Sequence, residues 1–385
     1  LMLTSGISFI NFKSKVKNIK LKQKLHSIIE NKNQVINSLG KNYQDSFCNK
    51  QLIKYKKSLN FRIIGMGGST LGAQTIYDFL KFKIKKKFIF VDNLQPKNKR
   101  EKKNFYTNLI VSKSGNTIET IVNSNILIKK KDKNIFITEN NKNYLYLLAE
   151  KLKADIIHHN NFIGGRYSVL SEVGMLPAEL MGLKKNNFRQ LNALIKNKKF
   201  FNSLVANVSS TLLFIKKKKF NSIIINYDEQ SESLFKWYQQ LVAESLGKKK
   251  KGLLPIVSNM PKDNHSVMQL YLDGFQNNFF TFFYVHEKKS KKVNNNLILS
   301  SQNYLKNKNL SEIIFSQKKA TENVFKKKNI PFRSFEIKKR DEKTLGELFC
   351  FFILETILLG ESLNLNPYDQ PAVELIKTET KNLLI

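Results

Sequence analysis

Cysteine is scarce in this chain of 385 residues, which contains only Cys48 and Cys350. Two thiols so far apart exclude a disulfide framework and do not favour a thiolate metal site. Long apolar runs are also missing, since Phe279 to Val285 is too short for a bilayer and Glu355 interrupts Leu348 to Leu359. The first residues lack the basic start and sustained apolar run of a signal peptide. We therefore expect no transmembrane helix and a cytoplasmic location.

Acidic residues are few, with 30 against 66 basic ones and a net charge of +36. Such an excess of positive charge suggests a polyanionic partner, for which nucleic acid is the first candidate. However, only six of the basic residues are arginine, the residue on which nucleic-acid readers rely for bidentate contacts. Nucleic-acid binding stays open as an alternative that rests on charge alone. We expect no specific nucleic-acid partner, and we expect the positive field to attract small anionic substrates.

Hydrophobic residues make up 41% of the chain and aromatic residues 11%, enough for a folded protein of two domains or one large α/β unit. The opening 45 residues are polar, with Leu21, Leu25 and Ile28 on one helical stripe. We expect this segment to pack as helices across the outside of a domain.

Short apolar runs separated by helical stretches begin at Phe61 and resume after a zone rich in Lys and Asn at 184–203. This spacing predicts parallel sheets with crossover helices. The expected strands are Phe61 to Gly65, Phe88 to Val91, Leu109 to Ser112, Ile135 to Thr138, Ile156 to Ile157, Ile223 to Asn226, Leu254 to Val257, Phe279 to Val285 and Phe332 to Ile337. The predicted fold class is α/β, with two doubly wound, flavodoxin-like domains over 49–195 and 196–385, an N-terminal helical arm over 1–48, and C-terminal helices.

Two strand-to-helix junctions have the composition of anion sites. The first holds Gly65, Gly67, Gly68 and Ser69, where glycines allow close backbone approach and a helix N-terminus offers free amides. It lacks both the spacing of a dinucleotide loop and a Walker lysine, so an ordinary tight turn is the alternative. The second junction holds a lysine among hydroxyl residues, for which a capping cluster is the alternative. Its residues are Ser112, Lys113, Ser114 and Thr117. Both junctions follow strands of one predicted sheet, so their loops should converge at its carboxyl edge.

Two further positions, Arg166 and Glu244, are candidates for chemistry. Arg166 follows two glycines and can stabilise developing negative charge, although a structural ion pair is the alternative. A predicted helix from Ser231 to Leu246 places Gln240 and Glu244 at i,i+4. Glu244 is a candidate base, and an exposed ion pair with Lys248 is the alternative.

His265 follows Pro261 at an apparent helix start, where the dipole favours neutral imidazole, but an ordinary histidine fits there equally well. Lys377, near the terminal helix, is by itself one lysine among many. The adjacent His158 and His159 have no metal-site spacing, so we expect no metal. Ser69 is not in a nucleophile elbow, which argues against serine hydrolase chemistry.

Taken in order, six segments resemble the glucose-6-phosphate isomerase (phosphoglucose isomerase) family, which is built from two sugar isomerase domains. The resemblance runs from Gly65 to Lys377. Its segments are Gly-x-Gly-Gly-Ser, Ser-Lys-Ser-Gly-Asn-Thr, Gly-Gly-Arg-Tyr-Ser, Gln-x-x-x-Glu-Ser-x-Gly-Lys, His265-Ser266, and Tyr368-Asp369-Gln370 to Lys377. Six blocks in the right order and rough spacing are very improbable by coincidence.

The resemblance implies isomerisation of glucose 6-phosphate and fructose 6-phosphate, a step of glycolysis and gluconeogenesis. Glu244 would move a proton between C2 and C1 through a cis-enediol, and Arg166 would hold the enediolate charge. His265, with Lys377, would open the sugar ring. The phosphate would be bound by Ser69, Ser112, Lys113, Ser114 and Thr117, and the sugar by Gly68, Gln240 and Gln370.

The resemblance implies no metal and no organic cofactor. It also implies a homodimer in which His265 reaches the active site of the neighbouring subunit. Another sugar-phosphate aldose-ketose isomerase, including one acting on mannose 6-phosphate, is an alternative, as is a non-catalytic sugar-phosphate sensor. Retention of Glu244, His265 and Lys377 argues against the sensor, because binding alone does not need all three.

Overall fold

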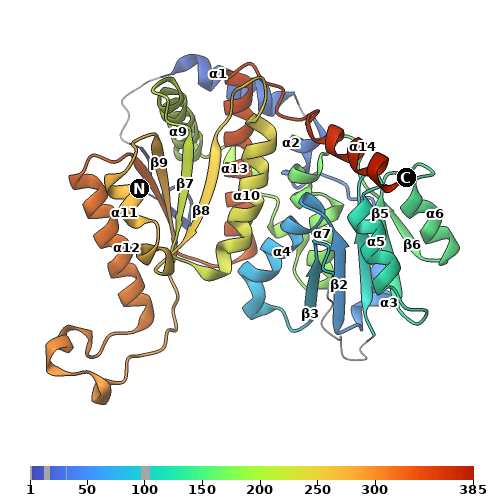
Figure 1. The fold of residues 1–385 in the computed structure, drawn as a ribbon, viewed down its shortest axis with the longest axis horizontal. Helices are drawn as coiled ribbons and strands as arrows, with labels where there is room; N and C mark the ends of the chain where they lie inside the picture. Colours follow the sequence, from blue (N-terminus) through green and yellow to red (C-terminus); the bar gives the residue numbers. More distant parts are fainter. Residues whose placement is uncertain (1, 13–17, 32, 97–104) are drawn as a thin grey trace.

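The computed structural model describes residues 2–12, 18–31, 33–96 and 105–385. Its two five-stranded sheets lie side by side with helices between them and on their outer faces (Figure 1). One apolar core cluster draws residues from both sheets, and two smaller clusters lie apart from it. The predicted α/β class with parallel sheets is confirmed.

The first sheet is parallel throughout, in the order β3-β2-β4-β5-β6. Every residue of β4 is buried, as expected for a strand covered by helices on both faces. Gly65 at the end of β2 pairs with Val111 at the end of β4, so the loops after these two strands leave the sheet together. The strands are β2 (Asn60–Gly65), β3 (Lys87–Val91), β4 (Thr107–Val111), β5 (Lys133–Thr138) and β6 (Asp155–His158).

The second sheet has the order β1-β10-β9-β7-β8, and all of its pairs are parallel except the one between β1 and β10. Its strands are β1 (Ile7–Ile10), β7 (Asn221–Asn226), β8 (Leu254–Asn259), β9 (Asn278–Val285) and β10 (Phe332–Ile337). Each of the nine strands expected from the sequence is present, with ends that shift by a few residues.

The N-terminal segment differs in part from the all-helical expectation. Helix α1 (Ile19–Glu30) buries Leu21, Leu25 and Ile28, as its stripe predicts. Before it, β1 buries Ile7 and Phe9 and pairs antiparallel with β10. The alternation of buried and more exposed residues in β1 covers only four residues, too few to show against a polar background.

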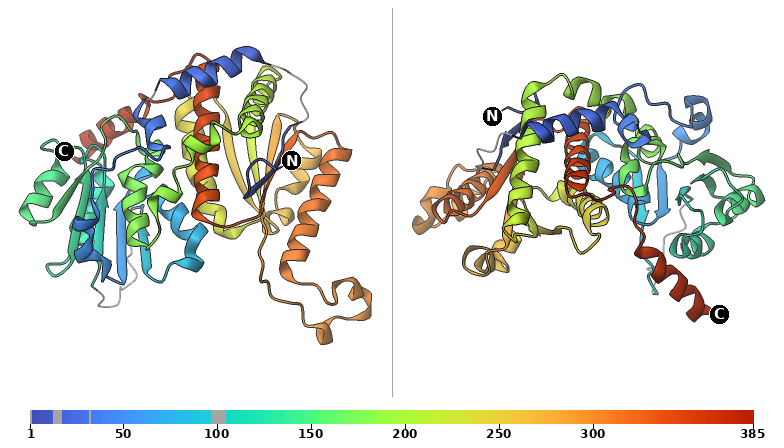
Figure 2. Two further views of the ribbon diagram at one scale, coloured as in Figure 1. Left: turned by 180° about the vertical axis from the view of Figure 1, so that it is seen from behind. Right: turned by 90° about the horizontal axis from the view of Figure 1, so that it is seen from above.

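Three helices, α4, α10 and α13, pack against one another between the two sheets (Figures 1 and 2). Helix α13 is buried over nearly all its length, as expected for a helix that is apolar on every side. The helices are α1, α2 (Gln34–Ser38), α3 (Asn49–Lys56), α4 (Gly68–Leu80), α5 (Ile118–Leu127), α6 (Tyr144–Lys151), α7 (Glu172–Leu180), α8 (Leu191–Leu194), α9 (Lys198–Lys216), α10 (Glu232–Leu246), α11 (Met268–Asp273), α12 (Leu310–Lys327), α13 (Glu342–Ser362) and α14 (Val373–Leu384).

Within the described ranges, no helix combines the length and the apolar character needed to span a membrane. The strands of the first sheet fall between residues 60 and 158, and those of the second, β1 apart, between 221 and 337. Domain limits at residues 48 and 195 stay a prediction.

Candidate active site

A cavity of about 380 Å³ lies where the loops after β2 and β4 leave the first sheet. That volume is within the range of sites for small molecules. Every predicted site residue except His265 lines it: Gly68, Ser69, Ser112, Lys113, Ser114, Thr117, Arg166, Gln240, Glu244, Gln370 and Lys377. The remaining lining residues are Met66, Glu139, Gly164, Gly165 and Tyr368.

The first wall of the cavity is the start of α4. A Cβ atom at Gly68 would overlap the carbonyl carbon of Gly165, so only glycine permits this contact. The close approach sets Ser69, in the first turn of α4, beside the turn that carries Arg166. A helix N-terminus facing a cavity presents a positive dipole to an anion.

The second wall is the loop between β4 and α5. Its Gly115 has φ +65°, a conformation that favours glycine, and the side chain of Asn143 fills the space beside it. The Ser112 and Thr117 hydroxyl groups lie 2.8 Å apart, and Thr117 does not cap α5 with its side chain. The loop is therefore not the capping cluster of the alternative interpretation.

Lys113 brings the positive charge of this loop to the cavity. Its Nζ donates to the carbonyl of Asn161 at 2.7 Å and lies 3.7 Å from Oε1 of Glu139. Two helix starts, hydroxyl groups and an ammonium thus face one space, which is an arrangement suited to a phosphate group.

Arg166 is 2% exposed and its guanidinium group is held on several sides. Nε donates to Ser245 Oγ at 2.8 Å, and Nη2 donates to the carbonyls of Pro367 at 2.7 Å and Asp369 at 3.0 Å. Nη1 donates to Gln370 Oε1 at 2.8 Å and to Glu244 Oε2 at 3.3 Å. The planar group therefore has one orientation, with one edge toward Glu244.

Glu244 lies on α10, and both of its carboxylate oxygens have partners. Oε1 accepts from Gln240 Nε2 at 2.8 Å, as the i,i+4 spacing predicts, and Oε2 accepts from Arg166. The alternative ion pair with Lys248 is not formed, because Lys248 Nζ binds Asp369 at 2.6 Å. With a side chain 27% exposed, the carboxylate still faces the cavity.

Gln240 has one unused hydrogen-bonding atom. Its Oε1 is buried and has no partner among the described residues, although its Nε2 binds Glu244. A buried amide oxygen without a donor costs free energy, so a ligand hydroxyl group that donates to it would be favoured.

The other two candidate catalytic residues lie differently. Lys377, on the exposed helix α14, lines the cavity. His265 ends a short 3-10 helix (Lys262–His265) after β8 of the second sheet, is exposed, and does not line the cavity. The site of a single chain therefore lacks this imidazole.

Three residues that support the site were not picked out as site residues from the sequence. Tyr167 Oη lies 2.8 Å from Ser245 Oγ and donates to the Pro367 carbonyl at 2.9 Å. Trp237 Nε1 donates to the Arg166 carbonyl at 3.1 Å. Tyr167 and Ser245 follow Arg166 and Glu244 directly in the chain, within two of the segments that resemble the family, and this is the signal that the sequence offers for them.

Tyr368 closes the cavity beside Gly164. Burial raises the pKa of its phenol to about 12, so the group stays protonated, and its oxygen accepts from Asn33 Nδ2 at 2.7 Å. Over the part of the chain that the structure describes, no three His, Cys, Asp or Glu side chains gather as a metal site would require.

The fold has counterparts among solved structures. A hypothetical protein from Thermus thermophilus superposes with a TM-score of 0.82 at 21% identity, covering 95% of this chain and 94% of the other. A glucose-6-phosphate isomerase from Chlamydia trachomatis superposes with a TM-score of 0.73 at 17% identity, covering 99% of this chain and 89% of the other.

Sequence relatives are closer. A glucose-6-phosphate isomerase from Methanocaldococcus jannaschii is 32% identical over 353 residues, 86% of each chain. One from Mesomycoplasma hyopneumoniae strain 7448 is 32% identical over 402 residues, 93% of each chain. The family model described as phosphoglucose isomerase matches residues 52–384. With the cavity, its two anion-suited loops and the Glu244–Arg166 pair in place, the chain belongs to the phosphoglucose isomerase family.

Proposed function

We propose that the chain catalyses the reversible isomerisation of glucose 6-phosphate and fructose 6-phosphate, a step of glycolysis and gluconeogenesis, in the cytoplasm. The observation that carries the proposal is the joining of two anion-suited loops and a carboxylate–guanidinium pair in one cavity. An aldose-ketose isomerase needs both, because it must hold a charged substrate while a base moves a proton between adjacent carbons.

Glu244 is the base in this proposal. It takes the proton from C2 of the open-chain aldose and returns it to C1 of the cis-enediol, and the reverse reaction uses the same two transfers. Gln240 and Arg166 hold one carboxylate oxygen each, which limits rotation of the group. A fixed carboxylate within reach of both carbons is what such a transfer requires.

Arg166 stabilises the negative charge that develops on the enediolate oxygens. Its contacts to Ser245, Pro367 and Asp369 preorganise the guanidinium group before substrate binds. Preorganised charge is the more effective kind, because no reorientation is needed as the reaction proceeds.

The phosphate group of the substrate binds at the two loops, to Ser69, Ser112, Lys113, Ser114 and Thr117. Gly68, Gln240 and Gln370 contact the sugar, with the unpartnered Oε1 of Gln240 accepting from a hydroxyl group. This placement puts the phosphate toward the first sheet and the reacting carbons toward α10.

Ring opening requires a group that moves a proton between O5 and O1. In this proposal that group is His265 of the neighbouring subunit, assisted by Lys377, in a homodimer with two composite sites. His265 is exposed and does not line its own cavity, which supports this arrangement.

The test is a coupled assay of fructose 6-phosphate conversion in the presence of EDTA. We expect turnover by the wild type and at least about 10²-fold less by Glu244→Gln, the scale of a lost general base. Glu232→Gln, an exposed change on the same helix, is the matched control and should leave turnover unchanged. In D2O the wild-type product should carry deuterium at the carbon that receives the proton. Absent turnover, or a near-normal Glu244→Gln variant, would refute the proposal.

A further inference from the structure

A short loop after β6, residues 159–163, lies next to the anion site. It leads directly into Gly164, Gly165 and Arg166, which line the cavity. Its Asn161 carbonyl accepts from Lys113 Nζ at 2.7 Å, and the His159 amide donates to the Thr138 carbonyl at 2.7 Å. The position of the Lys113 ammonium therefore depends on where this loop places one carbonyl oxygen.

Glu172, at the N-terminus of α7, is hydrogen-bonded to this loop. It is 1% exposed and lines no part of the cavity. Its Oε1 accepts from the Asn160 backbone amide at 2.7 Å, and its Oε2 accepts from the Tyr43 hydroxyl at 3.0 Å. The carboxylate thus fixes the residue that immediately precedes Asn161.

The surroundings of Glu172 contain one more titratable ring. His159 Nδ1 lies 4.0 Å from Glu172 Oε1 and donates to the Asn160 carbonyl at 3.1 Å. Burial lowers the pKa of His159 to about 4, so the ring is neutral at neutral pH and does not form an ion pair. The hold of Glu172 on the loop therefore consists of hydrogen bonds.

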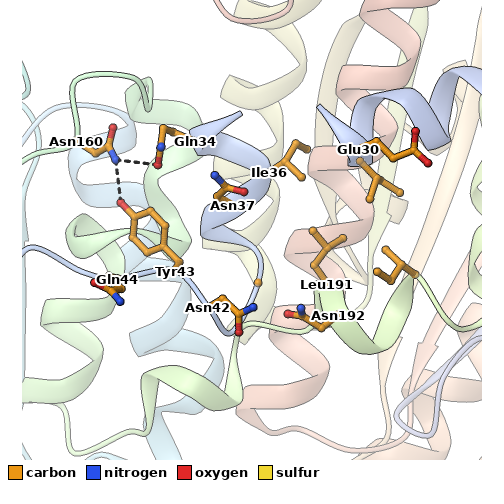
Figure 3. Close-up of a pocket in the computed structure, with 13 residues that line it drawn as sticks. Glu30, Gln34, Ile36, Asn37, Asn42, Tyr43, Gln44, Asn160, Leu191 and Asn192 are labelled. Atoms are coloured by element: carbon orange, nitrogen blue, oxygen red, sulfur yellow. Dashed lines mark hydrogen bonds between the residues drawn. The ribbon is translucent and has the colours of Figure 1, made fainter. Parts of the chain in front are cut away.

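The side chain of Asn160 is held as well. Its Nδ2 donates to Tyr43 Oη at 3.3 Å and to Gln34 Oε1 at 3.4 Å, as Figure 3 shows. These three side chains form one wall of a separate cavity of about 620 Å³ beside the α1–α2 segment. The hydroxyl group of Tyr43, a residue of the N-terminal segment, thus bonds both Asn160 of the loop and Glu172.

We propose that Glu172 is a positioning residue for the phosphate site, which acts by fixing Asn160 so that the Asn161 carbonyl holds Lys113. The proposal rests on the function proposed above, in which Lys113 binds the substrate phosphate. Lys113 Nζ also forms an ion pair with Glu139, whose Oε1 lies 3.7 Å away. A displaced Asn161 carbonyl would let the ammonium move closer to Glu139, so that less of its positive charge would act on the phosphate.

The expected change falls on binding rather than turnover. Arg166 keeps its own supports in Trp237, Ser245 and the Pro367 carbonyl, none of which belongs to the loop. Loss of Glu172 should therefore weaken phosphate binding while the groups that act on the sugar carbons stay in place. A variant that is merely less stable would show the opposite, a smaller active fraction with unchanged KM.

The experiment measures KM for fructose 6-phosphate, kcat, and the inhibition constant of inorganic phosphate. For Glu172→Leu we expect KM and the inhibition constant to rise about fivefold or more, the scale of a lost hydrogen bond to a charged group, with kcat within about twofold of wild type. Glu172→Gln should restore most of the binding. Its amide oxygen can accept from the Asn160 amide and its NH2 group can donate to the Tyr43 oxygen.

Glu347→Leu is the matched control. Glu347 is 3% exposed, accepts from the Thr4 hydroxyl at 2.6 Å, and belongs to α13 away from the cavity. It should lower the melting temperature without changing KM. Tyr43→Phe is a milder change that removes one donor to Glu172. We expect it to raise both KM and the inhibition constant. It also provides the test if Glu172→Leu does not fold.

Unchanged binding constants in a folded Glu172→Leu, or in Tyr43→Phe alone, overturn the positioning role. A loss of kcat at constant KM, as in a general destabilisation, overturns it too. Lys113→Met tests the proposed phosphate site separately from the positioning role of Glu172. It should weaken inhibition by phosphate even if Glu172 has no positioning role. If Lys113→Met also leaves phosphate inhibition unchanged, the phosphate site itself is wrongly assigned and the positioning role falls with it.

Discussion

Arg166 Nη1 and Glu244 Oε2 lie 3.3 Å apart although 78 residues separate them in the chain. Arg166 follows the first sheet, and Glu244 lies on a helix of the second. The guanidinium is buried while the carboxylate keeps an open side toward the cavity. Neither half of the chain therefore holds both members of the pair.

Arg166→Lys tests what the planar group contributes. Lysine is a point charge and cannot keep the contacts to Ser245, Pro367 and Gln370 together, so the charge over the enediolate would be poorly oriented. We expect kcat to fall about 10²-fold or more, with a smaller change in KM. Steady-state kinetics in both directions would measure it.

Arg333→Lys is the control for that substitution, because Arg333 is equally buried and pairs with Glu355, and neither residue lines the cavity. It should affect stability and leave kcat of the folded fraction unchanged. A rise of KM alone in Arg166→Lys would make Arg166 an anchor for bound substrate rather than a stabiliser of the intermediate.

The hydroxyl pair of the second loop should act on the phosphate group. Ser112→Ala combined with Thr117→Ala removes two groups that lie 2.8 Å apart at the start of α5. We expect KM for fructose 6-phosphate and the inhibition constant of inorganic phosphate to rise together, by about tenfold. Ser210→Ala, which removes a hydroxyl that donates to the Ala206 carbonyl of its own helix, is the comparison. Phosphate inhibition that does not change would locate the anion site elsewhere.

The composite site can be tested by mixing two inactive variants. Glu244→Gln chains and His265→Ala chains are mixed under conditions that allow subunits to exchange. In a mixed dimer one site collects both changes and the other collects neither. Random pairing makes about half of the dimers mixed, so activity should recover to about a quarter of the wild-type value.

Each variant exchanged with itself is the control for this recovery, and a mass-labelled chain reports whether mixed dimers form. Mixed dimers without recovered activity would mean that His265 works within its own subunit or has no part in the reaction.

His159 predicts how stability changes with pH. Its pKa is about 6.5 in an unfolded chain and, because of burial, about 4 in the folded one. The unfolded state therefore binds the proton first as pH falls, and the free energy of unfolding should drop between pH 7 and pH 5. From these two pKa values, His159 contributes about 2 kcal/mol to the fall in the free energy of unfolding.

Urea unfolding of the wild type and of His159→Gln at both pH values isolates this contribution. Lys113, His158 and Glu172 also face the ring, but they are present in both proteins and their effects largely cancel in the difference. The variant should lose about 2 kcal/mol less than the wild type. Equal losses would show that His159 takes up its proton in the folded state.

The central strands of both sheets could be predicted because each is a continuous apolar run that ends at a turn. Strand β1 could not, since its four residues pair with residues more than three hundred positions later. That two loops meet at one cavity could be predicted, because glycine and hydroxyl residues follow directly after neighbouring strands of one sheet. The carbonyls of Pro367 and Asp369 that hold Arg166 could not, because any residue carries a carbonyl and only the tertiary structure selects these.

Lys248 shows how local spacing fails. Its i,i+4 position would favour a pair with Glu244, worth a few tenths of a kcal/mol, if the helix continued through residue 248, but α10 ends at Leu246. In the fold, the segment before α14 brings Asp369 to 2.6 Å from Lys248, while Arg166 reaches Glu244 from the other side. Two contacts between distant segments replace one local pair, and no pattern within α10 reveals either of them.

The pairing of β1 with β10 has a consequence for synthesis of the chain. Ile7 and Phe9 leave the ribosome long before their partners Ile337 and Phe335 have been made. Until then β1 has no place in a sheet, and the second sheet cannot be closed at that edge. The last edge of the second sheet is therefore formed only when most of the polypeptide has been made.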